Sequence, residues 1–233
     1  MLSDLNVLFN QFHDIMAGTS LEAAYTDAGW QYGESLAIAQ RNLNQALQRL
    51  SWRIQIETDS NMRPLVVFNS HAWPVKTSVE VELGGVGPES VLRDQTGILI
   101  PWQLVQPQAT SNNRSRVCFM ADLPAFGWRV YKLYLKTDQK QPQPPAVESG
   151  ETWAENAWYR VTFSPLTGCI ASLYDKQRQA EVFRADAAVP VVIDDPSDTW
   201  SHDVLHFQNQ VGPFRLQRIY RAESGPVKTV IRV

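Results

Sequence analysis

The hydrophobic period of this chain changes near residue 62, and that change constrains the fold more than any other feature of the sequence. Before residue 62, apolar residues recur at spacings of three and four, which is typical of a helix with one buried face. After it, apolar and polar residues alternate in short runs, which is typical of half-buried strands. The sequence therefore predicts a mainly β protein with a helical segment at its N-terminal end.

Two helices are predicted before residue 62. The first is expected to end near His13 or Asp14, and a Thr19-x-x-Glu22 capping box predicts the start of the second. The second helix should extend to the region of Trp52, and a helix that long needs partners, expected upstream, to bury its apolar stripe. The apolar face of the first helix is Leu2, Leu5, Leu8, Phe9 and Phe12, and the stripe of the second is Leu36, Ala39, Leu43, Ala46, Leu47, Leu50 and Ile54.

Short strands separated by turn-forming residues follow, and this arrangement predicts an antiparallel β-sandwich. We expect a helical segment at 1–58, the remnant of a three-helix bundle, and a small β-sandwich at 62–137. A proline-rich connector at 136–151 then leads to the first part of a second, larger and incomplete β-sandwich at 150–233. The predicted strands are residues 64–69, 77–83, 90–93, 98–105, 116–121, 127–135, 157–163, 169–174, 189–193, 212–222 and 227–233.

Charge and cysteine content exclude several classes of protein. The net charge is −3 and acidic and basic residues are mixed, so no nucleic-acid or anionic-membrane partner is expected. The chain has no signal-peptide layout and no apolar run near the ~20 residues of a membrane span. Cys118 and Cys169 lie in separate predicted strands and are interpreted as core thiols, with a single disulfide as the alternative. We expect a cytoplasmic protein.

The adjacent residues His13 and Asp14 are the first candidate site. From the residues alone, a histidine at a helix end is more often held by the helix dipole or a core hydrogen bond than used as a ligand. One histidine cannot define a zinc site, which needs roughly three or four ligands.

The segment around Trp200 is the second candidate. His202 and His206 have the spacing of a helical zinc motif, but the preceding residues predict a loop, and in a strand this spacing is ~13 Å, too long for one metal. Carboxylates accept hydrogen bonds from sugar hydroxyls and an indole can stack on a sugar ring. The residues expected to contact a sugar, if the segment is more than a solvated turn, are Asp198, Trp200 and His202, with Asp194 and Asp195 in the same acidic cluster.

Several segments, taken together and in order, resemble the α-mannosidases of glycoside hydrolase family 38. They are NQFHDIMAGTS at 10–20, PLVVFNSHAWP at 64–74, LPAFGWRVY at 123–131, ENAWYRVTF at 155–163 and GCIASLYDK at 168–176. The resemblance covers nearly the whole chain but only the middle of a family member. It implies a catalytic α/β domain ahead of these residues and more β-sheet after them.

The resemblance implies roles for two residues. His13 matches a histidine that completes a zinc site, and Asp14 matches a carboxylate close to the bound sugar. The other ligands, a His-x-Asp pair and the aspartate nucleophile, would lie in the upstream catalytic domain. The implied activity of the intact protein is retaining hydrolysis of terminal α-mannosides, with zinc or a similar divalent metal.

On its own, this chain is predicted to be inactive and to hold no metal. Its expected partners are the upstream catalytic domain and α-mannoside glycans, with a homo-oligomer as a further possibility. The alternative hypothesis is a β-sandwich module without catalytic activity, which binds carbohydrate or packs against another subunit.

Overall fold

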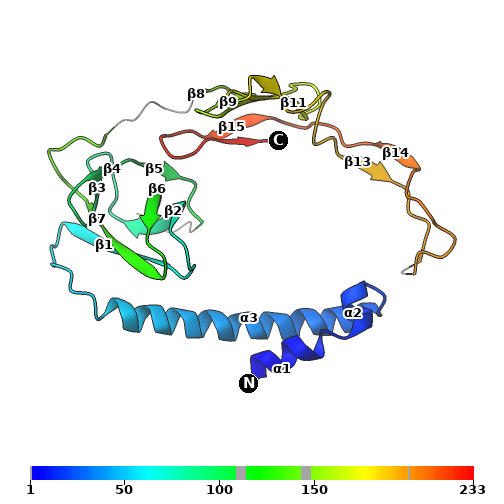
Figure 1. Ribbon diagram of the computed structural model, residues 1–233, viewed down its shortest axis with the longest axis horizontal. Helices are drawn as coiled ribbons and strands as arrows, with labels where there is room; N and C mark the ends of the chain where they lie inside the picture. Colours follow the sequence, from blue (N-terminus) through cyan, green and yellow to red (C-terminus); the bar gives the residue numbers. More distant parts are fainter. Residues whose placement is uncertain (1, 109–113, 143–147, 199) are drawn as a thin grey trace. The chain divides into compact units, whose positions relative to one another are not determined.

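The computed structural model describes residues 2–108, 114–142, 148–198 and 200–233 (Figure 1). Helices occupy the N-terminal end and antiparallel strands the remainder, so the predicted mainly β class is confirmed. The chain divides into two compact units. The first combines Met1–Gln55 with Val191–Pro213, and the second combines Ile56–Pro190 with Phe214–Val233.

The first helix is shorter than predicted. Helix α1 spans Leu2–Phe9, and His13 begins a separate short helix, α2, at His13–Ala17. Asn10 explains the break, because its amide nitrogen donates to the backbone oxygen of Asn6 at 2.8 Å and its own backbone oxygen accepts the hydroxyl of Tyr32 at 3.3 Å. Asn10 is buried, and these contacts end the helix before His13.

Helix α3 spans Glu22–Ser51 with Trp52 as its C-cap, as predicted. The predicted capping box is wrong. Leu21 is the N-cap, and its aliphatic side chain cannot make a cap hydrogen bond. The Thr19 hydroxyl donates instead to Asp14 Oδ1, 3.1 Å away. Gly18 has a φ of 83° and reverses the chain between α2 and α3, a conformation that favours glycine.

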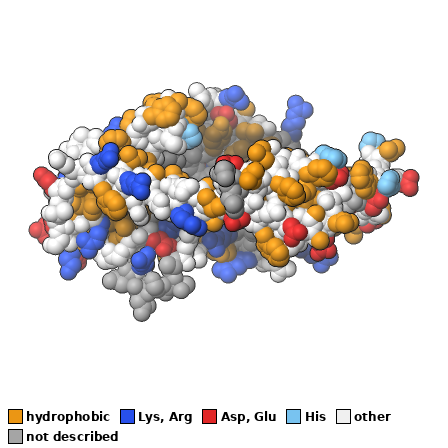
Figure 2. Space-filling view, turned by 90° about the horizontal axis from the view of Figure 1, so that it is seen from below, with side chains coloured by type: hydrophobic (Ala, Val, Ile, Leu, Met, Phe, Trp, Pro, Cys, Tyr) orange, Lys and Arg blue, Asp and Glu red, His pale blue; other side chains and the backbone are white. Residues whose placement is uncertain are grey.

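The apolar stripe of α3 remains accessible in the described part of the chain. Leu36 is 71% exposed, and Leu43 and Leu50 are each about half exposed. Helix α1 packs against α3, and its contacts include the hydroxyl of Ser35, which donates to the backbone oxygen of Ser3 at 3.0 Å. Hydrophobic side chains are visible on the surface of the helical region in Figure 2, where acidic and basic side chains are also interspersed.

The first β region is the predicted antiparallel sandwich. One sheet has the order β1-β7-β3-β4 and the other β2-β6-β5. Buried residues from both sheets form one core, made of Leu92, Trp102, Val117, Phe119, Ala121, Leu123, Tyr131 and Leu133. The strands are β1 Met62–Asn69, β2 Val75–Gly84, β3 Val91–Asp94, β4 Leu99–Ile100, β5 Trp102–Val105, β6 Arg114–Leu123 and β7 Gly127–Tyr134.

The second β region contains a five-stranded sheet of order β12-β11-β10-β9-β8 and two two-stranded ribbons. The predicted strand 212–222 is wrong as a single element, because the structure has separate strands at Gln210–Pro213 and Tyr220–Glu223. Pro213 has no backbone N–H, which weakens any continuation of the strand. The elements are β8 Glu148–Ser149, β9 Trp153–Glu155, β10 Tyr159–Phe163, β11 Ile170–Asp175, β12 Ala180–Glu181, β13 Val191–Ile193, β14 Gln210–Pro213, β15 Tyr220–Glu223 and β16 Val230–Arg232.

Two further expectations concern the cysteines and the membrane. Cys118 and Cys169 are both free and buried, so they are core thiols and form no disulfide. In the described ranges, no helix combines the length and apolar character that crossing a bilayer requires. The domain boundaries expected from the sequence stay predictions.

Candidate active-site segment

Helix α2 presents the imidazole of His13 to solvent. The His13 side chain is 80% exposed, and its Nε2 lies 3.7 Å from Oδ2 of Asp14. The ring of Phe12 packs against the imidazole with the two centroids 4.2 Å apart. This contact restricts the imidazole while leaving its nitrogens accessible to an external group.

Asp14 is held much more firmly than its position in a five-residue helix suggests. The Thr19 hydroxyl donates to Asp14 Oδ1 at 3.1 Å, and the Thr19 backbone N–H donates to the Asp14 backbone oxygen at 2.9 Å. That backbone oxygen also accepts the Tyr25 hydroxyl at 3.1 Å. The Tyr25 oxygen in turn accepts the backbone N–H of Ser20 at 2.9 Å, which fastens α2 to the first turn of α3.

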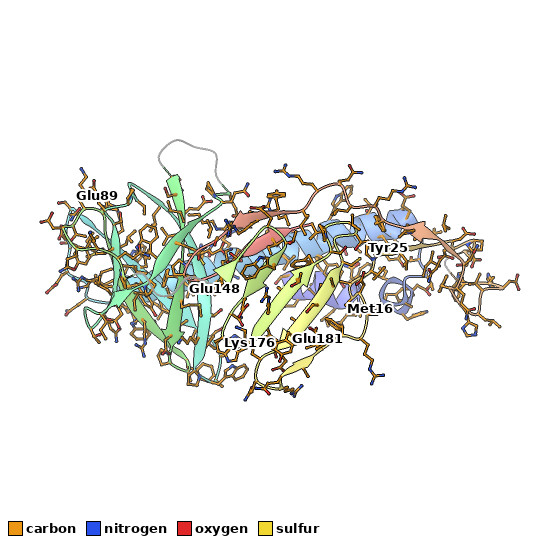
Figure 3. All side chains as sticks on the ribbon, turned by 90° about the horizontal axis from the view of Figure 1, so that it is seen from above. Met16, Tyr25, Glu89, Glu148, Lys176 and Glu181 are labelled. Atoms are coloured by element: carbon orange, nitrogen blue, oxygen red, sulfur yellow. The ribbon has the colours of Figure 1, made fainter. Side chains whose placement is uncertain are left out.

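These contacts fix one oxygen of the Asp14 carboxylate and leave the other facing His13. Tyr25 and Met16 both lie at the end of α3 where α2 is attached (Figure 3). The sequence pattern identifies neither Thr19 nor Tyr25 as a support of the site. It assigns Thr19 to a helix cap and gives Tyr25 no role. The signal that could have identified them is the left-handed turn at Gly18, which brings the start of α3 back to α2.

The residues in this segment fit a metal site only in part. An imidazole nitrogen and a carboxylate oxygen are both ordinary zinc donors, whereas a complete site has roughly three or four protein ligands. Within the described residues, no group of three or more His, Cys, Asp or Glu side chains is arranged to hold a metal ion. The remaining ligands of any metal at His13 would therefore have to come from other residues.

The structure brings Asp198 and His202 together as a second pair. Asp198 Oδ2 lies 2.6 Å from His202 Nδ1, and Asp198 Oδ1 accepts the backbone N–H groups of Trp200 at 2.9 Å and His202 at 3.2 Å. The hydrogen bond from His202 is the main cause that lowers the pKa of the Asp198 carboxyl. Trp200 is 61% exposed. The carboxylate thus organises a turn that presents an indole to solvent.

His206 does not take part in this pair. It lines a separate small cavity of about 210 Å³ together with Asp194 and Asn209, whose side chains are 3.3 Å apart. Asp195 instead accepts the backbone N–H of Ser197 at 3.0 Å, as in a local turn. The acidic cluster expected from the sequence is therefore divided among separate turns.

Comparison with known proteins gives a match in structure alone. No protein-family model matches the sequence, and no curated protein does. The similar solved structures include an α-mannosidase from Enterococcus faecalis V583, with a TM-score of 0.72, and a glycosyl hydrolase family 38 protein from Enterococcus faecalis, with a TM-score of 0.71. Each is 14% identical to this chain and covers 98% of it.

The chain spans 30% and 31% of the lengths of those two proteins. The likeness extends over the helical segment and both β regions, because nearly all of this chain is aligned. This chain therefore has the fold of a helical and β-sheet portion of glycosyl hydrolase family 38 structures, as the resemblance of its sequence segments implied.

Proposed function

We propose that this chain is the helical and β-sheet portion of a retaining, metal-dependent α-mannosidase that hydrolyses terminal α-mannosides. The observation that carries the proposal is the structural match, over 98% of the chain, to a protein described as an α-mannosidase. The accessible His13 and Asp14 pair supports it, because the imidazole is suited to a metal and the carboxylate to a sugar hydroxyl, and solvent reaches both side chains.

In this proposal, His13 is a metal ligand and Asp14 accepts a hydrogen bond from a hydroxyl of the bound mannoside. The contact with Phe12 reduces the rotational freedom that the imidazole would lose on binding. The hydrogen bonds from Thr19 and Tyr25 hold Asp14 in place before the sugar arrives. When bound, the metal would supply a Lewis acid for orienting the sugar hydroxyls.

We further propose that the chain alone is inactive. It offers one imidazole and one carboxylate at this segment, and we place the nucleophile and the other metal ligands in a part of the protein outside these residues. Retaining hydrolysis needs a pair of carboxyl groups that flank the scissile bond at about 5 Å from each other.

Hydrolysis of an aryl α-mannoside tests the proposal. The longer protein that carries this chain should lose most of its activity and some of its bound metal on His13→Ala. The matched control is His71→Ala, because His71 stacks on Trp73 in the β1–β2 turn, with ring centroids 4.8 Å apart, and has no role in the proposed site. Equal activity and metal content in the two variants would contradict the role of His13, and turnover by the isolated chain would contradict its predicted inactivity.

The second candidate function is a carbohydrate-binding module without catalytic activity. The observation that favours it is the exposed indole of Trp200 beside the Asp198 and His202 pair. Titration of the isolated chain with mannose, followed by tryptophan fluorescence, separates the two candidates. Saturable binding that disappears in Trp200→Ala, but persists in Trp158→Ala, would favour the module; Trp158 is similarly exposed, at 63%.

A further inference from the structure

A pocket in the second β region is distinct from both candidate sites described above. Its volume is about 570 Å³, which falls in the range of roughly 300–1,000 Å³ that is usual for small-molecule sites. It lies between the segment that follows β14 and the ribbon formed by β15 and β16. The lining residues that matter here are Phe214, Arg215, Leu216, Arg218, Arg232 and Val233.

Part of the pocket lining is apolar, and two of its residues lie close to Gly168. Leu216 and Val233 approach Gly168 so closely that a Cβ atom at this glycine would lie 2.3 Å from Val233 Cγ1 and 2.9 Å from Leu216 Cδ1. Gly168 also has a φ of +75°, which a side chain would strain. The backbone N–H of Phe214 donates to the oxygen of Pro190 at 3.2 Å and holds one wall.

Three arginines also line the pocket. No carboxylate forms an ion pair with Arg215, Arg218 or Arg232 among the residues that the structure describes. The guanidinium of Arg218 lies over the ring of Tyr220, 4.1 Å from its centroid. Arg232 donates to Oε1 of Gln106 at 2.9 Å, which fixes its side chain.

We propose that this pocket binds an organic anion with a planar apolar body, such as an aromatic sulfate, sulfonate, phosphate or carboxylate. The apolar lining residues would cover the ring of the ligand, and the guanidinium groups would pair with its anionic group. Arginine suits this role because its planar donors match the oxygens of such anions and because it is weakly hydrated. The inference does not depend on the proposed mannosidase activity, since no lining residue belongs to α2.

Two dyes of nearly equal shape test the proposal in the purified protein. The anion 1-anilinonaphthalene-8-sulfonate should bind about tenfold more tightly than N-phenyl-1-naphthylamine, which lacks the sulfonate. The variants Arg215→Gln and Arg218→Gln should each lower the affinity for the sulfonate dye severalfold and leave the affinity for the neutral dye unchanged. The control is Arg184→Gln, because Arg184 is exposed, lies in the same unit and does not line the pocket.

The same samples show whether the variants fold and whether the dye binds in this pocket. Unchanged circular dichroism spectra of the variants establish that they fold. Rising salt concentration should lower the affinity for the sulfonate dye but not for the neutral dye. Equal affinity for the two dyes would overturn the proposal. So would equal losses of affinity in Arg215→Gln, Arg218→Gln and Arg184→Gln, because the dye would then be responding to overall charge rather than to this pocket.

Discussion

The side chain of Gln103 fills the space that a side chain at Gly225 would occupy. A Cβ atom built on Gly225 would lie 2.6 Å from Cδ and Oε1 of Gln103 and 2.8 Å from its Cβ. Gln103 Oε1 accepts the backbone N–H groups of Val227 and Lys228, both at 2.9 Å, and its Nε2 donates to the Lys228 oxygen at 3.1 Å. One buried amide therefore joins strand β5 of the first sandwich to the ribbon of β15 and β16.

Gly225→Ala should destabilise the protein. The added methyl group cannot be accommodated without displacing Gln103, and overpacking of this kind costs about 1–3 kcal/mol. The free energy of unfolding in urea should fall accordingly, with little change in the control Gly87→Ala, since no atom lies within 4 Å of a Cβ at Gly87. Equal stability of the two variants would show that the ribbon moves freely at this contact.

Gln103→Ala should also destabilise the protein, by a different route. The substitution removes three hydrogen bonds and leaves the N–H groups of Val227 and Lys228 without their acceptor, a loss of about 2–4 kcal/mol. Hydrogen exchange should quicken at those two amides in particular. Gln177→Ala is the control, because Gln177 is exposed. Unchanged protection of the Val227 and Lys228 amides from hydrogen exchange would contradict the view that Gln103 links β5 to the ribbon of β15 and β16.

Stability should depend on pH through Glu80. The hydrogen bond from Lys228 is the largest cause that lowers the pKa of Glu80 from its usual value of 4.5, and Arg116 contributes at 2.8 Å. Because the pKa is lower in the folded state, Glu80 stabilises the fold above pH 4.5, and this stabilisation is lost as the pH falls through the folded value.

The measurement is the urea midpoint at a series of pH values between about 3 and 7. Glu80→Gln should lower the midpoint at neutral pH and reduce its fall in acid. The control is Glu89→Gln, an exposed residue in a turn of the same unit (Figure 3). An identical acid profile for Glu80→Gln and the unchanged protein would exclude this carboxylate as a source of the pH dependence.

The parts of the fold that follow from local pattern could be predicted from sequence. Helix α3 and the alternating strand β2 are set by the spacing of apolar residues along a single element. The break after α1 is different, because it depends on contacts of Asn10 with Gln31 and Tyr32, which lie more than a helix turn away in sequence. The local spacing of apolar residues does not reveal such tertiary contacts.

The candidate site divides in the same way. Recognition of His13 and Asp14 rested on resemblance, and whether they bind metal and sugar stays a prediction. Their support by Thr19 and Tyr25 could not be read from spacing, because Thr19 fits a capping box equally well as a pattern. Only the path of the chain through Gly18 decides which partner the hydroxyl meets.

Thr19→Val tests whether the support of Asp14 matters for the proposed activity. Valine keeps the shape of threonine but cannot donate to Asp14 Oδ1, so the carboxylate loses the contact that orients it. In the longer α-mannosidase proposed above, kcat/KM for an aryl α-mannoside should fall about tenfold or more, the size of effect seen when residues that orient a site are removed. The control is Thr26→Val, because the Thr26 hydroxyl donates only within α3, to the Glu22 oxygen at 3.2 Å. A loss that is equal in the two variants, or absent in Thr19→Val, would mean that the orientation of Asp14 does not limit the reaction.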